Sequence, residues 1–323
     1  MRGGLGTTLK ELLTSLTGKV GVAFFLVMLG VSAYALIANP LDFGPRLWNN
    51  PSVWADNPKN VPPVWTGLFS SVRRVDHRVF ETSEPTAVRE TTRGVEKLYT
   101  FDLDYRFDEE PTFTSFSIEG VTYGSRPPTI ILSVARPDGK DLTLYRFVVP
   151  APRPEESAPI QRYSETPFRV YLTGEPSVAS EVSQFVQDEF ESRVPSSQLV
   201  GRVDQAIFGI PDAQNQGAFR PLKGQYKITL LARLQDPQDS IGGVKFVLGG
   251  SQFGLMGTDS IGRDLARGLI FGFPVALGIG LITAIVATVI GTSMGIISGY
   301  VGGKTDIGIQ RFSDVLTNIP LLP

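Results

Sequence analysis

The sequence predicts an α-helical membrane protein with a large β-rich domain between two membrane spans. Two long uncharged apolar segments, residues 20–38 and 268–303, enclose a polar region of residues 39–253. That region holds 21 of the 24 prolines and 27 of the 32 acidic residues of the 323-residue chain. Its apolar residues often alternate with polar ones, as in half-buried strands. We therefore expect two spans of a larger helical bundle and an inserted domain that is sandwich-like.

The first span is predicted over residues 20–38, after an N-terminal segment of residues 1–19. Its 19 residues carry no charge, and a helix needs about 20 residues to cross a bilayer. Arg2, Lys10 and Lys19 precede it against the single acid Glu11, so the positive-inside rule places the N-terminus in the cytoplasm. The alternative is a secretory signal peptide with "AYA" at 33–35 as its cleavage site. The long leader favours the uncleaved anchor.

The second apolar segment is too long for one span. Between Arg267 and Lys304 there are 36 uncharged residues, whereas a bilayer core takes about 20. We expect an interfacial segment over 254–272 and a second span over 273–299, with Pro274 in the first turn of its helix. Small residues recur every fourth position, which lets membrane helices pack closely; these are Ala276, Gly280 and Ala284, and Ala287, Gly291, Gly295 and Gly299. The alternative is the glycine richness common to membrane helices.

The region between the spans shows strand patterns. In "LYTFDLDYRF" (98–107) aromatic and apolar residues alternate with polar ones. "TIILSVAR" (129–136) and "LTLYRFVV" (142–149) flank "PDGKD", whose Asp-Gly predicts a hairpin turn. "YKITLLARL" (226–234) and "VKFVL" (244–248) predict a second strand pair. One helix is expected over about 178–193, with Ser177 as its cap and Pro195 after its end.

Composition removes several kinds of chemistry. The chain has no cysteine and a single histidine, so thiol catalysis and a multi-histidine metal site are excluded. A net charge of −2 gives no indication of nucleic-acid binding. His77 has Asp76 beside it but no nucleophile motif nearby, which favours an ordinary surface or satisfied histidine.

Two other patterns partly resemble binding sites. "SGYVGGKT" (298–305) resembles a phosphate-binding loop, but the first position is Ser298 where the motif needs glycine, and it follows an apolar span. The acidic residues between Asp102 and Glu110 lack the spacing of a calcium loop, so a solvated strand face is favoured. We expect no cofactor and no metal.

The string "GLMGTDSIGRDLARG" (254–268) places charges directly before an apolar segment. Thr258 and Asp259 suit a helix N-cap, where a side-chain oxygen accepts from free backbone N–H groups. Arg263 and Arg267 are four residues apart and would share a helix face. Such a helix would lie in the head-group zone of the outer leaflet. This local account explains why the charges are tolerated.

A family resemblance accounts for the whole string. "LMGTDSIGRDLARGLIFG" resembles the beginning of the membrane domain of ABC-transporter permeases of the dipeptide, oligopeptide and nickel class. Downstream, "SGYVGGKTDIGIQRFSDVLTNIPLLP" resembles a second motif of the same family. The matching residues of the first motif are Gly257, Thr258, Asp259, Gly262, Arg263, Asp264, Arg267 and Gly272. Those of the second are Gly299, Tyr300, Gly302, Gly303, Asp306, Arg311, Asp314 and Pro320.

The resemblance implies a permease subunit of an ATP-driven importer for peptides or similar small solutes. It implies a second permease subunit, two ATPase subunits and an extracytoplasmic solute-binding protein as partners. The protein would be a multi-pass component of the cytoplasmic membrane, in contact with lipid and with no nucleic acid. It would not itself be an enzyme, because ATP hydrolysis would belong to the separate ATPase subunits. The motif residues would then be structural or gating residues, and none would be catalytic.

Two departures from the family pattern shape the expectation. Residues 39–253 form a far longer external segment than the family usually has between its first two spans. The cytoplasmic coupling loop that docks the ATPase is missing, so residues 300–323 are expected to be a cytoplasmic loop and the start of a truncated third span. We therefore expect a fragment of a permease. The alternative is a membrane-anchored receptor or adhesion protein with an extracellular β-rich domain. The sequence does not choose between peptide, oligosaccharide and nickel as substrate.

Overall fold

The computed structural model describes residues 12–38, 42–215 and 217–318. The chain divides into two compact units. The first unit is Met1–Leu47 with Arg267–Pro323, and the second is Trp48–Ala266. Pro320 and part of the predicted N-terminal segment lie outside the described residues. Each unit is described by itself.

The first unit contains the long helices. They are α2 (Leu16–Ala38), α6 (Leu265–Val301), whose first two residues belong to the second unit, and α7 (Gly303–Asn318). Helices α2 and α6 are long and apolar enough to cross a membrane, by length and composition. Most of their apolar side chains are exposed and do not pack against other parts of the protein. This is the state expected of helices whose solvent is lipid.

Two predictions for this unit were wrong. Helix α6 continues through Pro274, where the sequence predicted an interfacial helix to end and a span to begin. The surrounding residues are all uncharged, and the loss of one backbone hydrogen bond at proline does not end an apolar helix. Residues 303–318 form α7, where a cytoplasmic loop leading to the start of a third span was predicted. There Ile309, Phe312 and Leu316 follow the i, i+3, i+7 spacing of a helix.

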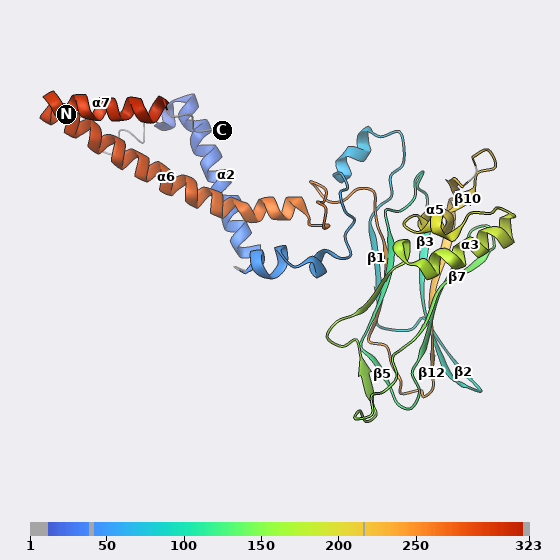
Figure 1. The fold of residues 1–323 in the computed structure, drawn as a ribbon. Helices are drawn as coiled ribbons and strands as arrows, with labels where there is room; N and C mark the ends of the chain where they lie inside the picture. Colours follow the sequence, from blue (N-terminus) through green and yellow to red (C-terminus); the bar gives the residue numbers. More distant parts are fainter. Residues whose placement is uncertain (1–11, 39–41, 216, 319–323) are drawn as a thin grey trace. The chain divides into compact units, whose positions relative to one another are not determined.

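Among its described residues, the second unit contains two larger antiparallel sheets and two two-stranded pairs (Figure 1). The four-stranded sheet has the order β1-β13-β4-β9, and its strands are Arg78–Thr82, Gly243–Leu248, Thr114–Glu119 and Phe168–Tyr171. The five-stranded sheet has the order β2-β3-β12-β6-β7, and its strands are Ala87–Thr91, Gly94–Tyr105, Gly224–Leu234, Thr129–Ala135 and Asp141–Val148. The small pairs are β5 (Val121–Tyr123) with β8 (Ile160–Arg162) and β10 (Gly209–Pro211) with β11 (Phe219–Pro221).

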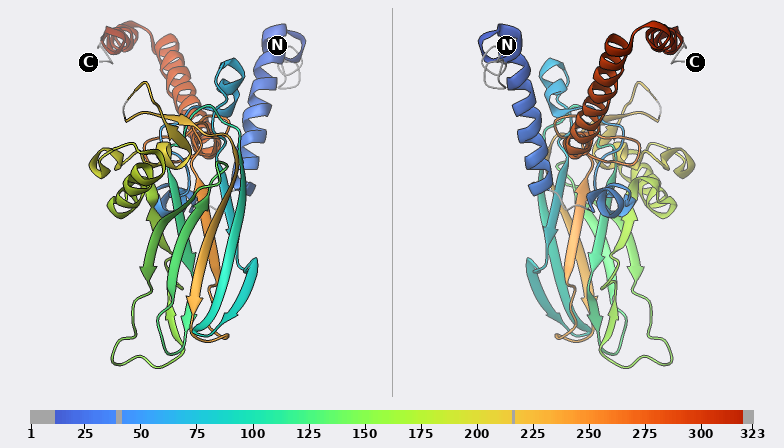
Figure 2. Two further views of the ribbon diagram at one scale, coloured as in Figure 1. Left: turned by 90° about the vertical axis from the view of Figure 1, so that its right-hand side faces the viewer. Right: turned by 90° about the vertical axis from the view of Figure 1, so that its left-hand side faces the viewer.

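The two sheets face each other across one hydrophobic core (Figure 2). Ring centroids lie 5.8 Å apart between Phe80 on β1 and Phe101 on β3. At the other side, Phe147 on β7 and Phe168 on β9 are 4.4 Å apart. Aromatic pairs at these distances add to the stability that their buried area supplies.

Strand predictions fared differently. The alternation over 98–107 is confirmed, because every second residue from Tyr99 to Phe107 is buried. The hairpin around Gly139 is confirmed as the antiparallel pair β6 and β7. The predicted pairing of 226–234 with 244–248 was wrong. Strand β12 lies between β3 and β6, and β13 lies between β1 and β4 in the other sheet.

Short helices cover one end of the sheets (Figure 1). They are α3 (Pro176–Phe190), α4 (Ser196–Leu199) and α5 (Val203–Ile207), with the 3-10 turn η4 (Leu172–Gly174). Helix α3 buries Val178, Val182, Phe185 and Val186, but it begins at Pro176, and Ser177 is not its cap. It ends where Glu191 adopts a left-handed conformation with φ of 53°.

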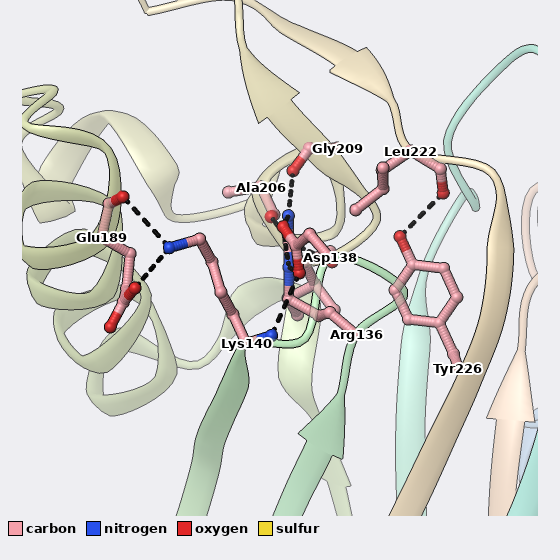
Figure 3. A network of polar contacts seen from close by, with 9 residues as sticks. Arg136, Asp138, Lys140, Glu189, Ala206, Gly209, Leu222 and Tyr226 are labelled. Atoms are coloured by element: carbon pink, nitrogen blue, oxygen red, sulfur yellow. Dashed lines mark hydrogen bonds and ion pairs between the residues drawn. The ribbon is translucent and has the colours of Figure 1, made fainter.

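Arg136 fastens this helical block to the β6–β7 hairpin (Figure 3). Its fully buried guanidinium donates to the carbonyl oxygens of Ala206 (2.7 Å), Ile207 (2.6 Å) and Gly209 (2.8 Å). It also pairs with Asp138 at 3.1 Å. A planar guanidinium presents five N–H donors from three nitrogens in a fixed fork, whereas a lysine presents three donors from one nitrogen.

Candidate functional site

The first motif forms a closed loop that leads into α6. One carboxylate oxygen of Asp259 accepts from the backbone N–H of Ile261 (3.1 Å) and of Arg263 (3.0 Å). The other accepts from Nε of Arg263 at 2.6 Å. Gly262 closes the loop with φ of +87°, a conformation that favours glycine. The spacing G-T-D-x-x-G-R therefore places one carboxylate where it accepts hydrogen bonds from the backbone N–H groups and from the arginine side chain of the same turn.

The pKa of Asp259 is lowered from its ordinary value. Burial acts to raise this pKa, but the hydrogen bonds from the Arg263 side chain and from the backbone of Arg263 and Ile261 lower it more. The guanidinium of Arg263 lies over the ring of Trp48, with Cζ 4.5 Å from the ring centroid. Both charges of the pair thus have partners inside the second unit, which is what a structural role requires.

Asp264 caps α6. Its Oδ1 accepts from the backbone N–H of Ala266 at 3.0 Å, and α6 begins at Leu265. The expectation that Thr258 or Asp259 caps this helix was wrong, because the helix starts later than its apolar periodicity suggested. Arg263 consequently lies before the helix and does not share a helix face with Arg267. In the first unit, Arg267 Cζ lies 5.3 Å from the ring centroid of Phe43.

The loop is bound by a segment about 200 residues earlier in the chain. Thr258 makes two contacts with Val61: its N–H donates to the carbonyl oxygen at 3.0 Å, and its Oγ1 accepts from the N–H at 3.3 Å. Asn57 donates from Nδ2 to the carbonyl oxygen of Gly262 at 2.9 Å. Gly257, with φ of +75°, lies so close to Val61 that a side chain would overlap its carbonyl oxygen. We call residues 48–69 and 252–266 together the junction.

The junction contains every tryptophan of the protein. These are Trp48, Trp54 and Trp65. Trp54 donates from Nε1 to the carbonyl oxygen of Trp48 at 3.3 Å, and Trp65 donates from Nε1 to that of Leu255 at 3.0 Å. Sequence reasoning missed this partner segment. The clustering of three tryptophans within 18 residues directly after an apolar span was the available signal, since tryptophan concentrates at membrane interfaces.

The second motif lies in the first unit, at the turn between α6 and α7. Gly299 and the 91 % exposed Tyr300 belong to the last turn of α6. Gly302 and Gly303 have φ of +63° and +60°, so they break the helix. Arg311 and Asp314 lie exposed on α7, while Gly272 lies in α6.

Asp306 holds the helix break together. Its carboxylate accepts from the Ser298 hydroxyl before the break and from Gln310 Nε2 at 3.0 Å after it. The Gly-Lys-Thr of the rejected phosphate loop opens α7, so its context is helix to helix rather than strand to helix.

The remaining sequence candidates are held in separate local contacts. Asp108 pairs with Lys223, and Glu109 accepts from the Ser251 hydroxyl. His77 packs edge-on against Phe253, with centroids 5.3 Å apart, and burial lowers its pKa against the opposing effect of Asp56. Within the described ranges, no three His, Asp or Glu residues are grouped as a metal site would need.

Comparison with known proteins adds an independent observation. No family model matches the chain. One segment of the chain is similar to peptide-transport permeases. Over 66 residues it is 41 % identical to the oligopeptide transport system permease protein OppC of Haemophilus influenzae, covering 20 % of this chain and 21 % of that protein. Over 74 residues it is 42 % identical to the dipeptide transport system permease protein DppC of the same organism, covering 23 % and 25 %.

A third relative is named for peptidoglycan transport. The peptidoglycan transport system permease protein YejE of Agrobacterium fabrum is 37 % identical over 67 residues, covering 21 % of this chain and 18 % of that protein. The chain thus matches a quarter or less of the length of these relatives.

The likeness to solved structures is weak. An infectious bursal disease virus structure gives a TM-score of 0.22 at 12 % identity, over 53 % of this chain and 32 % of that one, which supports no argument about fold.

Proposed function

We propose that the protein is a permease subunit of an ATP-driven importer for peptides or similar small solutes, and that its helices form part of the translocation pathway. The observation that carries the proposal is the 37–42 % identity to permease proteins over 66–74 residues. That length agrees with residues 254–323, which hold both motifs. Two helices long and apolar enough to cross a membrane fit the same role.

The proposed topology follows from charge. The N-terminus lies in the cytoplasm, α2 and α6 cross the membrane, and the β-rich unit is an extracytoplasmic sandwich inserted between them. A second permease subunit, two ATPase subunits and a solute-binding protein complete the transporter. Transport follows alternating access, in which ATP-driven closure of the ATPases rocks the membrane helices. Peptide is the default substrate, and oligosaccharide or nickel are the other possibilities within this class.

The junction supports a structural role for the first motif. Asp259 and Arg263 satisfy each other, Asp264 caps α6, and Thr258 and Gly257 contact Val61. We propose that the motif fixes the turn that leads into α6, through contacts that lie within the second unit.

Association with the ATPase subunit tests the proposal. The protein is purified with an affinity tag from native membranes in mild detergent, and co-purifying proteins are identified by mass spectrometry. Recovery of an ABC-type ATPase and a second permease in stoichiometric amounts supports the proposal. Quantitative recovery of the protein without an ATPase contradicts it and favours the anchored receptor.

The outer domain is the proposed docking site of the solute-binding protein. Its size and position motivate this role. Binding of the purified solute-binding protein is compared between the whole protein and a variant without residues 78–248, in the same lipid discs. Unchanged affinity in the deletion variant would remove that role from the outer domain.

A further inference from the structure

The junction carries an exposed apolar patch that the motif contacts do not use. Its large side chains extend into solvent, with exposed fractions of 83 % for Leu68, 84 % for Phe69 and 73 % for Leu255. Single exposed leucines are ordinary, but a group of large apolar side chains marks an interaction surface. The patch consists of Val64, Trp65, Leu68, Phe69, Leu255 and Met256.

Hydrogen bonds hold the two parts of the patch together. Trp65 donates from Nε1 to the carbonyl oxygen of Leu255 at 3.0 Å, and the N–H of Val64 donates to that of Gly254, also at 3.0 Å. The 3-10 helix η3 (Val64–Phe69) turns its Gly67 toward the protein, where a Cβ would lie 2.7 Å from Oε1 of Gln252. Trp65 and Leu68 are three residues apart and lie one above the other in such a helix.

The patch adjoins the beginning of α6. The N–H of Leu265, the first residue of that helix, donates to the carbonyl oxygen of Gly257 at 3.2 Å. Met256 is the residue before Gly257. The apolar patch therefore lies directly beside the first residue of α6. That helix is long and apolar enough to cross a membrane.

The charges around the patch fit a lipid head-group region. Residues 60–72 and 246–258 carry no charged side chain, and Lys59 and Arg73 bound the first of these segments. Both bounding residues are basic and exposed. Tryptophan, phenylalanine and leucine beside basic residues are typical of segments that lie in the membrane interface.

We propose that this patch inserts into the outer leaflet of the bilayer and seats the β-rich unit on the membrane surface. The proposal rests on the proposed function, because it requires α6 to cross a membrane. The η3 helix enters the apolar side of the interface, and Lys59 and Arg73 remain among the head groups. The occupant of the patch is the lipid, not a second protein.

Spin labelling of the whole chain tests the proposal, because the protein has no cysteine to remove. Phe69→Cys and Leu68→Cys are made singly, labelled with a nitroxide, and reconstituted in discs of phosphatidylcholine and phosphatidylglycerol. Accessibility to oxygen, which concentrates in lipid, is compared with accessibility to a water-soluble nickel complex. Two controls accompany them: Thr92→Cys in an exposed turn of the β-rich unit, and Ile285→Cys on the exposed surface of α6.

We expect the labels at positions 68 and 69 to have an oxygen-to-nickel accessibility ratio several-fold above that at position 92 and closer to that at position 285. Ratios equal to that at position 92 mean that the patch faces water, and the proposal is wrong. Protection from both reagents means that protein covers the patch, and the proposal is equally wrong. If the label at position 285 is also accessible mainly to nickel, α6 is not in the bilayer, and the proposed function fails with it.

Discussion

At the scale of single residues, a comparison of two glycines distinguishes the cost of backbone strain from the cost of steric overlap. Gly257 and Gly139 have almost the same φ, +75° and +76°. An added Cβ at Gly139 meets nothing within 4 Å, whereas one at Gly257 would overlap the carbonyl oxygen of Val61. Replacement by alanine therefore carries the same conformational penalty at both positions, but it creates a steric clash only at Gly257.

We expect Gly139→Ala to lower the free energy of unfolding by about 1 kcal/mol, the usual cost of a left-handed alanine. Gly257→Ala should cost at least about 2 kcal/mol more, because the two segments of the junction must separate to admit the methyl group. Chemical denaturation of the purified variants in detergent measures both. Equal losses would show that the contact between Gly257 and Val61 is not tight in solution.

A second residue-scale prediction concerns Asp204. This carboxyl group is fully buried and accepts from the hydroxyls of Thr114 (2.5 Å) and Thr173 (2.6 Å). Burial raises its pKa to about 6, although both hydroxyls act to lower it. The folded state then binds the proton more tightly than the unfolded state, whose value is about 3.9. The contribution of Asp204 to stability is complete below about pH 4 and is lost as the pH rises through about 6.

Asp204→Asn should remove this dependence. Relative to the variant, the native protein should lose on the order of 3 kcal/mol of unfolding free energy between pH 4 and pH 7. Thermal or chemical unfolding across that range measures the difference. Asp102→Asn, at an exposed position on β3, is the control and should leave the native pH profile unchanged. Parallel profiles for the native protein and Asp204→Asn would contradict the raised pKa.

Residue chemistry in the first motif could be predicted only in part. The residue types indicated side chains that cap the helix, and a helix cap exists. Their assignment failed, because Asp264 caps the helix and Asp259 serves the turn before it. The deciding contacts are between Thr258 and Val61 and between Gly262 and Asn57, 197 and 205 residues apart. No local pattern encodes pairs at that separation.

At the scale of elements, the helical block depends on one buried side chain. Arg136 donates to three carbonyl oxygens at the end of α5 and the start of β10, and its guanidinium lies 5.3 Å from the Phe185 ring centroid on α3. One guanidinium thereby joins the β6–β7 hairpin to α3 and α5. A lysine in this position keeps the charge but cannot reach all three oxygens.

We expect Arg136→Lys to destabilise the second unit by about 2–3 kcal/mol, because buried carbonyl groups lose their donors. Hydrogen exchange should accelerate most in α3, α5 and the β10–β11 pair. Arg146→Lys, at an exposed position on β7, is the matched control and should change neither stability nor exchange. A uniform increase in exchange over both sheets would indicate that Arg136 supports the whole core rather than the helical block.

Element pairing shows where sequence reasoning stops. The hairpin of β6 and β7 was predictable because its turn residues are adjacent in the chain. Strands β12 and β13 are also adjacent in the chain, but they belong to different sheets. Both strands are rich in buried apolar residues, so their composition does not indicate to which sheet each belongs. The partner of each strand is fixed by packing across the core, as between Phe80 and Phe101, which alternation alone does not reveal.

At the scale of the whole molecule, the sequence predicted two long apolar segments and a β-rich region between them, and the structure contains both. The Pro274 break and the loop after α6 were not correct, since a helix boundary within apolar sequence depends on its surroundings. Which side of the membrane each part occupies is a prediction from three basic residues, Arg2, Lys10 and Lys19. It needs an experiment on intact membranes.

The absence of cysteine makes that experiment direct. Thr92→Cys lies in the β-rich unit and Lys304→Cys lies at the start of α7, and both positions are exposed. With the N-terminus inside, a membrane-impermeant maleimide added to right-side-out vesicles should label position 92 at once and position 304 only after permeabilisation. Inverted vesicles should give the opposite order, which controls for reactivity. Labelling of position 304 from outside would mean that α6 does not cross the membrane or crosses it in the other direction, and the proposed topology would then be wrong.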